Sequence, residues 1–234
     1  MFRSLGRAAL GRFLGSLVSV QTDEKVAALT FDDGPDPEST PLLLDILGAY
    51  DAKATFFMLG EAAARNPALV SQVAESGHEI GNHTFSHPDS TEISLQQFLK
   101  ETRKADAVLA PFVRPIFRPP FGFINMRVRV TLKLMQKTVV KWNVTTEDHR
   151  QANSLRILER LNSQIMPGSI VLLHDGLKTR GGGNGSPNRA IMLEAVKEFL
   201  KERHGEYEFV TVSEMLRRGL GCYQWWNRKA KGVK

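Results

Sequence analysis

The order of the hydrophobic segments constrains the fold of this chain more than any other feature. From Lys25 onward, short apolar runs rich in β-forming residues alternate with longer segments of helical period. This is the pattern of repeated βα units, and it predicts parallel strands. Seven such units can form an open doubly wound sheet or a barrel, and chain length does not separate the two. We expect strands at residues 26–31, 54–59, 78–82, 115–118, 138–144, 169–174 and 207–211.

Local signals place several helix ends between these strands. Thr40 before Pro41 predicts an N-cap followed by the first helical residue. Ser94 with Gln97 matches a capping box. Gly77 is expected to end the helix that precedes it, because glycine readily adopts the left-handed conformation found there.

The chain is expected to form one α/β domain, because no repeat, low-complexity tract or linker divides it. We place that domain at residues 25–218, after an N-terminal extension at 1–24 that is helical or frayed and before a basic aromatic tail at 219–234. The glycine-rich segment 178–187 predicts a surface loop, which is either a lid over a groove or a plain connection.

Cysteine content and the start of the chain bear on the compartment. Cys222 is the only cysteine, so no internal disulfide can form and nothing indicates an oxidising compartment. Arg3, Arg7 and Arg12 interrupt the apolar run that an export signal needs. These features favour the cytoplasm, with the inner membrane face as an alternative and secretion as the competing interpretation.

The chain is basic, with a formal net charge of +6, which favours contact with something anionic. Its basic termini predict peripheral membrane contact, and Trp225 and Trp226 in the tail suit a membrane interface, stacking on sugar rings or plain packing. No nucleotide-binding glycine motif occurs, and we expect no nucleic acid partner. No feature indicates an obligate protein partner.

Polar motifs follow the expected strands at their C-terminal ends, where both architectures carry their chemistry. Asp32 and Asp33 come directly after the first strand and before Gly34 and Pro35. Adjacent like charges are costly unless a cation neutralises one of them, so a metal at Asp33 would leave Asp32 as a base. A turn with two solvated carboxylates is the alternative.

Two histidines strengthen the metal interpretation. His83 and His87 lie four residues apart, so on a helical turn or a tight loop both imidazoles can converge on one ion. Asn82 and Thr84 offer hydrogen bonds that would orient them. Two nitrogen ligands and one carboxylate, with open positions for water, are the composition of a catalytic Zn²⁺ site.

Three further polar clusters lie at later strand ends. Taken singly, Arg118 could be a surface ion pair, Trp142 a core aromatic and His174 a loop histidine. At one rim with a metal triad, however, an arginine, a further histidine and a further carboxylate are what an acid–base hydrolase requires. These clusters occupy residues 118–122, 142–148 and 172–175.

In its ordered motifs the chain resembles the polysaccharide deacetylase family, the NodB-homology domain of carbohydrate esterase family 4, over about residues 25–216. The resemblance implies a distorted (β/α) barrel of seven or eight units, a divalent metal that is usually Zn²⁺, and removal of acetyl groups from N-acetylglucosamine-type sugars. The matching motifs are residues 30–35, 83–87, 118–122, a degenerate fourth at 142–148, and 172–175.

The resemblance also implies roles for individual residues. Asp33, His83 and His87 would hold the metal, Asp32 would be the general base for the attacking water, and Arg118 would keep that base ionised and aimed.

On the side of the leaving group, His174 would be the general acid and Asp148 the partner that orients it and raises its pKa. The backbone N–H of Phe121 would stabilise the oxyanion. The expected substrate pocket residues are Leu172, Trp142 and Pro120.

The chain departs from the family in the fourth motif, where Thr145 stands in place of a frequent Asp and His149 in place of a Trp. This departure concerns the shape of the groove and the partner of His174. The expected substrate is an N-acetylated glycan or glycolipid, namely a chitooligosaccharide, peptidoglycan or a lipid-linked amino sugar. An O-acetyl esterase and a non-catalytic glycan-binding derivative are the alternatives, and Co²⁺, Mn²⁺ and Ni²⁺ are alternatives to Zn²⁺.

Overall fold

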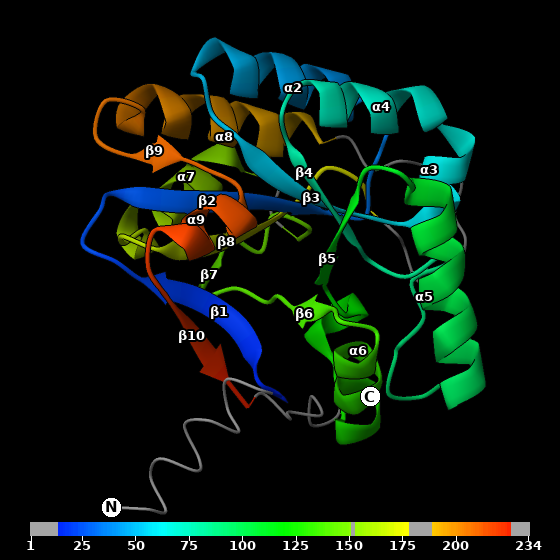
Figure 1. Ribbon diagram of the computed structural model, residues 1–234. Coiled ribbons are helices and arrows are strands. Elements are labelled where there is room, and N and C mark those ends of the chain that lie inside the picture. The colour runs from blue at the N-terminus through cyan, green and yellow to red at the C-terminus, as the bar shows by residue number, and fades with distance from the viewer. Residues whose placement is uncertain (1–13, 151–152, 178–188, 226–234) are drawn as a thin grey trace, which may run out of the picture.

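The structure is a computed structural model that describes residues 14–150, 153–177 and 189–225 (Figure 1). The expected surface loop at 178–187, the first thirteen residues and Trp226 lie outside these ranges. Among the described residues, no helix combines the length and the apolar character that crossing a bilayer requires.

One ten-stranded sheet organises the described chain, in the order β10-β1-β8-β2-β3-β4-β5-β6, with β7 paired to β8 and β9 paired to β2. The strands are β1 (Ser16–Gln21), β2 (Val26–Asp32), β3 (Ala54–Met58), β4 (Glu79–Asn82), β5 (Val113–Phe117), β6 (Thr138–Val139), β7 (Val144–Thr145), β8 (Ser169–His174), β9 (Glu208–Phe209) and β10 (Leu220–Gln224).

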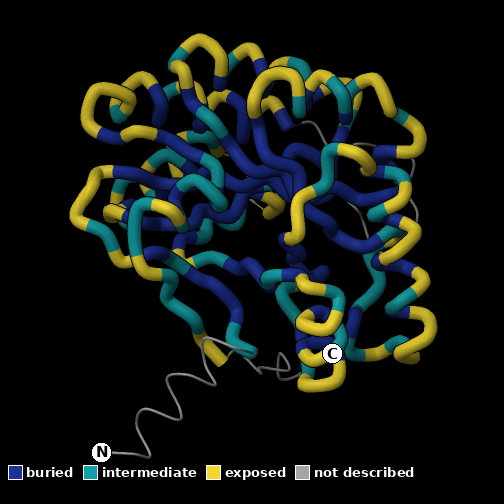
Figure 2. The backbone as a smooth tube through the Cα atoms, in the orientation of Figure 1, coloured by how far each residue is buried: buried dark blue, intermediate teal, exposed yellow. Residues whose placement is uncertain are grey.

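Helices cover the outside of this sheet, with α2, α4 and α8 side by side over one part of it and α5 and α6 at another edge (Figure 1). Figure 2 shows the strands buried at the centre and the exposed residues on the outer sides of the helices. The helices are α2 (Thr40–Ala49), α3 (Gly60–Arg65), α4 (Pro67–Glu75), α5 (Leu95–Leu109), the short 3₁₀ helix η1 (Pro120–Gly122), α6 (Met126–Leu134), α7 (Ser154–Gln164), α8 (Ala190–Arg203) and α9 (Val212–Arg217).

The sheet curls until its two ends meet. Strands β8, β2, β3, β4, β5 and β6 are parallel to one another, whereas β1 runs antiparallel to β8. An isolated parallel bridge joins Leu17 of β1 to Val140, and the Lys141 N–H donates to the Leu17 carbonyl at 2.7 Å. The same segment continues into β7, which pairs with β8. The result is a distorted barrel, which confirms the expected barrel over the open sheet.

Strand β2 explains how the barrel interior comes to carry polar chemistry. Side chains on a strand alternate between faces, and Leu29 and Phe31 pack in the cluster beneath the helices. Val26 and Ala28 pack instead in the interior cluster with residues such as Phe57 and Ile170. The same alternation turns Thr30 and Asp32 inward, so the interior becomes polar toward the C-terminal end of the strand.

Strands β1 and β10 correct two expectations. Ser16–Gln21 lies in the extension expected to be helical or frayed, and that expectation was wrong for these six residues, which form a strand. Leu220–Gln224 of the expected tail pairs with it antiparallel. Leu17, Val18 and Val20 are almost fully buried between neighbouring segments, so tertiary packing decides their conformation. The single strand expected at 138–144 is instead two short strands, β6 and β7.

The expected helix ends are mostly observed. Gly77 has φ +80° just after α4, and the Ser94 hydroxyl accepts the Gln97 N–H at 3.1 Å. The Gln97 side chain does not return to the cap, because it donates to Glu101. Helix α2 begins at Thr40 with Ser39 as its N-cap, one residue before the expected cap.

Candidate metal centre and active site

Three of the expected residues form a compact group, called the metal group below, at the C-terminal ends of the strands. Asp33 follows β2, and His83 and His87 follow β4. One ligand atom from each lies within 4.8 Å of the other two. Parallel strands bring their C-terminal ends to one rim, so residues fifty positions apart in sequence meet here.

The spacing of these atoms fits a metal ion better than hydrogen bonding. Asp33 Oδ1 lies 3.5 Å from His83 Nε2 and 3.4 Å from His87 Nε2, which is long for hydrogen bonds. Ligands about 2.1 Å from a tetrahedral ion are separated by about 3.4 Å. Burial lowers the pKa of His87 to about 4, although Asp33 opposes the shift, so this imidazole is neutral at neutral pH, as a metal ligand must be. The residues therefore fit a divalent cation.

A strained loop, rather than a helical turn, presents the two histidines. Asp33, Thr84 and His87 all have φ between 63° and 73°, a region that residues other than glycine rarely adopt. Asn82 Oδ1 accepts the Thr84 N–H at 2.8 Å, and Thr84 Oγ1 accepts the His87 N–H at 3.1 Å. Asn82 and Thr84 thus support the site as expected, by fixing the backbone rather than the rings.

Glu101 of α5 also holds this loop, and the sequence did not indicate it. Its buried carboxylate accepts the N–H groups of Phe85 and Ser86 at 3.1 and 2.8 Å, and the Ser86 hydroxyl at 3.1 Å. The available signal was a glutamate on the face of α5 that otherwise buries Phe98 and Ala105. A carboxylate at such a position requires polar partners.

Replacing Glu101 with Ala should weaken metal binding about 10- to 100-fold, the usual effect of losing a residue that supports metal ligands. Alanine removes the one oxygen that accepts the N–H groups of both Phe85 and Ser86, so the loop of His83 and His87 should loosen. Competition with a chromogenic chelator measures the affinity. Glu159→Ala, at an exposed position of α7, is the control. An unchanged affinity in the Glu101 variant would refute this role.

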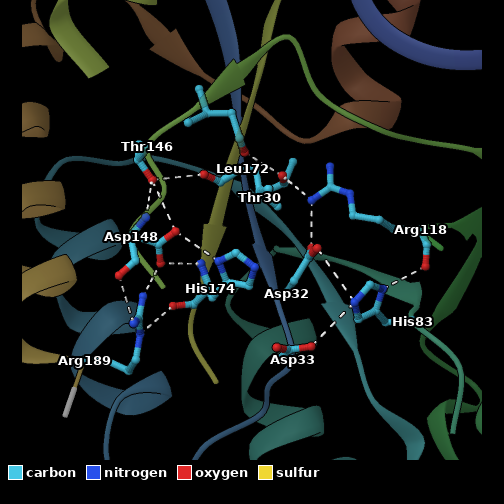
Figure 3. Close-up of polar contacts among 11 residues, drawn as sticks. Thr30, Asp32, Asp33, His83, Arg118, Thr146, Asp148, Leu172, His174 and Arg189 are labelled. Atoms are coloured by element: carbon cyan, nitrogen blue, oxygen red, sulfur yellow. Dashed lines mark hydrogen bonds and ion pairs between the residues drawn. The ribbon is translucent and has the colours of Figure 1, made fainter. Parts of the chain in front are cut away.

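Asp32 lies beside the metal group but is held by an arginine. Its Oδ1 accepts a hydrogen bond from Arg118 Nη1 at 2.7 Å, and its Oδ2 lies 3.8 Å from His83 Nε2 (Figure 3). Asp32 is 3 % exposed and Arg118 is fully buried. Burial lowers the pKa of Arg118, and the Asp32 carboxylate opposes that shift. The pair holds a carboxylate next to the metal group, which is the position that a general base requires.

Arg118 joins the base to the metal ligands. Its Nη1 also donates to Thr30 Oγ1 at 2.7 Å and its Nη2 to the Lys141 carbonyl at 3.0 Å. Its own carbonyl accepts a hydrogen bond from His83 Nδ1 at 2.7 Å, which leaves His83 Nε2 facing Asp33. One residue therefore orients both the Asp32 carboxylate and the His83 imidazole.

His174 lies across from these groups at the end of β8. In the pairing of β2 with β8 it is the direct neighbour of Asp32, and Figure 3 shows it on the opposite side of Asp32 from Arg118 and His83. Its Nδ1 lies 3.0 Å from Asp148 Oδ1. Burial lowers the pKa of His174, but the charge and hydrogen bond of Asp148 outweigh burial and raise it to about 9. The imidazole is therefore protonated at neutral pH.

Arg189, which precedes α8, contacts both Asp148 and His174 and was not expected from the sequence. Its Nη2 forms an ion pair with Asp148 Oδ2, and its Nε donates to the His174 carbonyl at 3.0 Å. Burial raises the pKa of Asp148, yet His174 and Arg189 lower it overall. No motif surrounds Arg189, so only the folded chain reveals its role.

His149, the residue that departs from the family pattern, is exposed and contacts His174 edge to face at 5.2 Å between ring centroids. With Asp148 and His174 it forms a second group of ligand-type residues. Asp148, however, already accepts from His174 and Arg189 through its two oxygens. This group is better suited to positioning a proton than to binding an ion.

Aromatic residues line the approach to the metal group. The Phe121 ring, 38 % exposed, packs edge-on against His87 at 4.5 Å between centroids. A Cβ at Gly122, where φ is +68°, would lie 2.9 Å from the Trp142 indole, so only glycine allows this packing. Pro120 and Leu172 are buried. The oxyanion role of the Phe121 N–H and the pocket roles of Pro120, Trp142 and Leu172 stay predictions.

Comparisons with known proteins agree with this geometry. The sequence profile of the polysaccharide deacetylase family matches residues 19–140. A peptidoglycan-N-acetylglucosamine deacetylase of Bacillus cereus is 39 % identical over 202 residues, which cover 85 % of this chain and 91 % of the relative. A peptidoglycan-N-acetylmuramic acid deacetylase, PdaC of Bacillus subtilis, is 34 % identical over 84 % of this chain but only 40 % of its own length. The crystal structure of a peptidoglycan N-acetylglucosamine deacetylase superposes with a TM-score of 0.76 at 31 % identity, covering 88 % of this chain and 94 % of that one.

Proposed function

The chain belongs to the polysaccharide deacetylase family, and from this premise we propose that it removes N-acetyl groups from N-acetylglucosamine-type glycans by metal-dependent hydrolysis. One observation carries the proposal. A carboxylate held by Arg118 and an imidazolium held by Asp148 lie on neighbouring strands beside the Asp33, His83 and His87 group. A base and an acid at one metal site are what amide hydrolysis requires.

When bound, the cation supplies Lewis-acid polarisation of the acetyl carbonyl. Asp32 removes a proton from the attacking water, and Arg118 holds Asp32 in position. The Phe121 N–H donates to the developing oxyanion. Because His174 Nδ1 is engaged by Asp148, its Nε2 carries the proton that is delivered to the departing amine. An amine is a poor leaving group until it is protonated, so this acid favours an N-acetyl over an O-acetyl substrate.

We propose Zn²⁺ as the resident ion, because two imidazole nitrogens and one carboxylate are its usual catalytic ligands. Co²⁺, Mn²⁺ and Ni²⁺ suit the same donors. The identity of the substrate, a chitooligosaccharide, peptidoglycan or a lipid-linked amino sugar, also belongs to the proposal. So does the place of action, the cytoplasm or its membrane face.

Acetate release from N-acetylglucosamine oligomers tests the proposal. We expect release from the purified protein to fall at least about tenfold after chelation, because the ligands must be metallated to act, and to return when Zn²⁺ or Co²⁺ is restored. Elemental analysis should find about one bound ion per chain. Protein without bound metal, or release that chelation leaves unchanged, would overturn the proposal. Bound metal without release from oligomers or peptidoglycan would favour the glycan-binding alternative.

A further inference from the structure

Helix α6 presents an apolar row to solvent. Met126, Val130 and Leu134 are spaced four residues apart and are 42, 43 and 81 % exposed, whereas Val128 and Leu132 of the same helix are fully buried. Residues at this spacing share one side of a helix. Single exposed apolar residues are ordinary, but a continuous row on one helix marks a contact surface.

Helix α6 carries cations and no acidic residue. The sequence of α6, MRVRVTLKL, contains no acidic residue, and Arg127 and Lys133 are exposed beside the apolar side chains. An amphipathic helix that carries apolar residues next to Lys and Arg has the composition of helices that lie in the interface of anionic membranes.

Arg129 of the same helix contacts both ends of the described chain. Arg129 Nη1 donates to the Leu14 carbonyl at 2.9 Å, and the Arg129 guanidinium lies 5.6 Å from the Trp225 ring. Trp225, itself 40 % exposed, adds an aromatic residue suited to a membrane interface.

The sequence beyond these two anchor points is basic on both sides. Residues 1–13 contain three arginines and residues 226–234 contain four cations, and neither segment contains an acidic residue. The sequence therefore adds seven cations and no acidic residue beyond the two described chain ends that Arg129 of α6 contacts. These cations are Arg3, Arg7, Arg12, Arg228, Lys229, Lys231 and Lys234.

The apolar row is close in sequence to the segment that contacts His87. Helix η1 (Pro120–Gly122) is separated from α6 by only residues 123–125. Phe121, whose ring contacts His87, lies 6.1 Å from the Phe123 ring between centroids. A short link therefore connects α6 to the Phe121 segment.

We propose that α6, defined by Met126, Val130 and Leu134 with their flanking cations, is a docking surface for an anionic phospholipid bilayer. Apolar side chains would enter the interface while Arg127 and Lys133 approach the lipid phosphates. Docking in this orientation presents the site to sugars at the membrane surface. The substrate class, an N-acetylated sugar carried on a lipid, rests on the proposed function, whereas the docking itself does not.

Sedimentation of the full chain with sucrose-loaded vesicles tests the docking. We expect binding to vesicles of 3:1 phosphatidylcholine and phosphatidylglycerol, weaker binding to phosphatidylcholine alone, and a decrease with added salt. Leu134→Glu and, separately, Val130→Glu should each lower the partition coefficient at least about tenfold, because an apolar contact is lost and a like charge approaches the lipids. Both positions are exposed, so the fold should persist.

Leu155→Glu is the matched control, since Leu155 is 69 % exposed on α7, apart from α6 (Figure 1). It should bind vesicles as the unmodified protein does, and all three variants should keep their metal content and their release of acetate from a soluble oligomer. Failure of the unmodified protein to bind anionic vesicles, or equal binding by the Leu134 and control variants, would overturn the docking surface. Self-association that Leu134→Glu abolishes, without vesicle binding, would assign α6 to a second copy instead. Loss of acetate release in every protein, with vesicle binding intact, would count against the proposed function alone.

Discussion

Replacing Asp32 with Asn should lower the rate of acetate release about 10³-fold while the bound metal stays at the level of the unmodified protein. General bases contribute roughly 10²–10⁴-fold, and Asp32 is the buried carboxylate beside the metal group that Arg118 holds at 2.7 Å. The Asn carbonyl can still accept that hydrogen bond, so the geometry should survive. The amide cannot take a proton from water, so the chemical step should fail.

The control for this variant is Asp45→Asn, at an exposed position of α2, which should leave the rate unchanged. The ratio kcat/KM should fall chiefly through kcat, since Asp32 acts on the attacking water. Retention of more than about a tenth of the activity would remove Asp32 from the role of base. Loss of the metal would instead make Asp32 a ligand and would contradict the division of roles between the two adjacent aspartates.

The central strands and the grouping of Asp33, His83 and His87 could be predicted because their signals are local. Strands β2, β3 and β8 are almost wholly buried, so each is a continuous apolar run that can be read without knowledge of its neighbours. Asp32 and Asp33 follow such a run directly. Strand β1 could not be predicted in this way, because its sequence, SLVSVQ, forms a strand through pairing with β8 and β10. Arginines before it favoured a frayed helix instead.

The supporting residues could not be predicted, because their contacts join segments that no local pattern connects. Glu101 reaches the loop of Phe85 from α5, and Arg189 reaches Asp148 across 41 residues of sequence. No sequence pattern around Thr84 or His87 predicts the left-handed backbone that both residues adopt. The pairing of His174 with Asp148 was expected only through the family resemblance, and the structure brings the two within 3.0 Å.

Replacing Asp148 with Asn should move the alkaline limb of the pH–rate profile to lower pH. In the unmodified protein the charge and hydrogen bond of Asp148 raise the pKa of His174 to about 9 against the opposing effect of burial. The acid form is required, so activity should persist through neutral pH and decline as pH rises through about 9. Without the carboxylate, burial acts with less opposition, the pKa of His174 falls, and the proton is lost at lower pH.

At pH 9 the Asp148→Asn rate should therefore be lower by roughly 10²-fold, within the range attributed to general acids, and the deficit should shrink as pH falls. A purely structural defect would lower the rate equally at every pH, so the shape of the profile separates the two explanations. Titration of His174 by NMR gives an independent measurement of the same pKa. His204→Gln, at an exposed position after α8, is the control and should leave the profile unchanged. An alkaline limb that stays near pH 9 in Asp148→Asn would contradict the prediction. It would mean that the limb does not report a His174 proton whose pKa depends on Asp148.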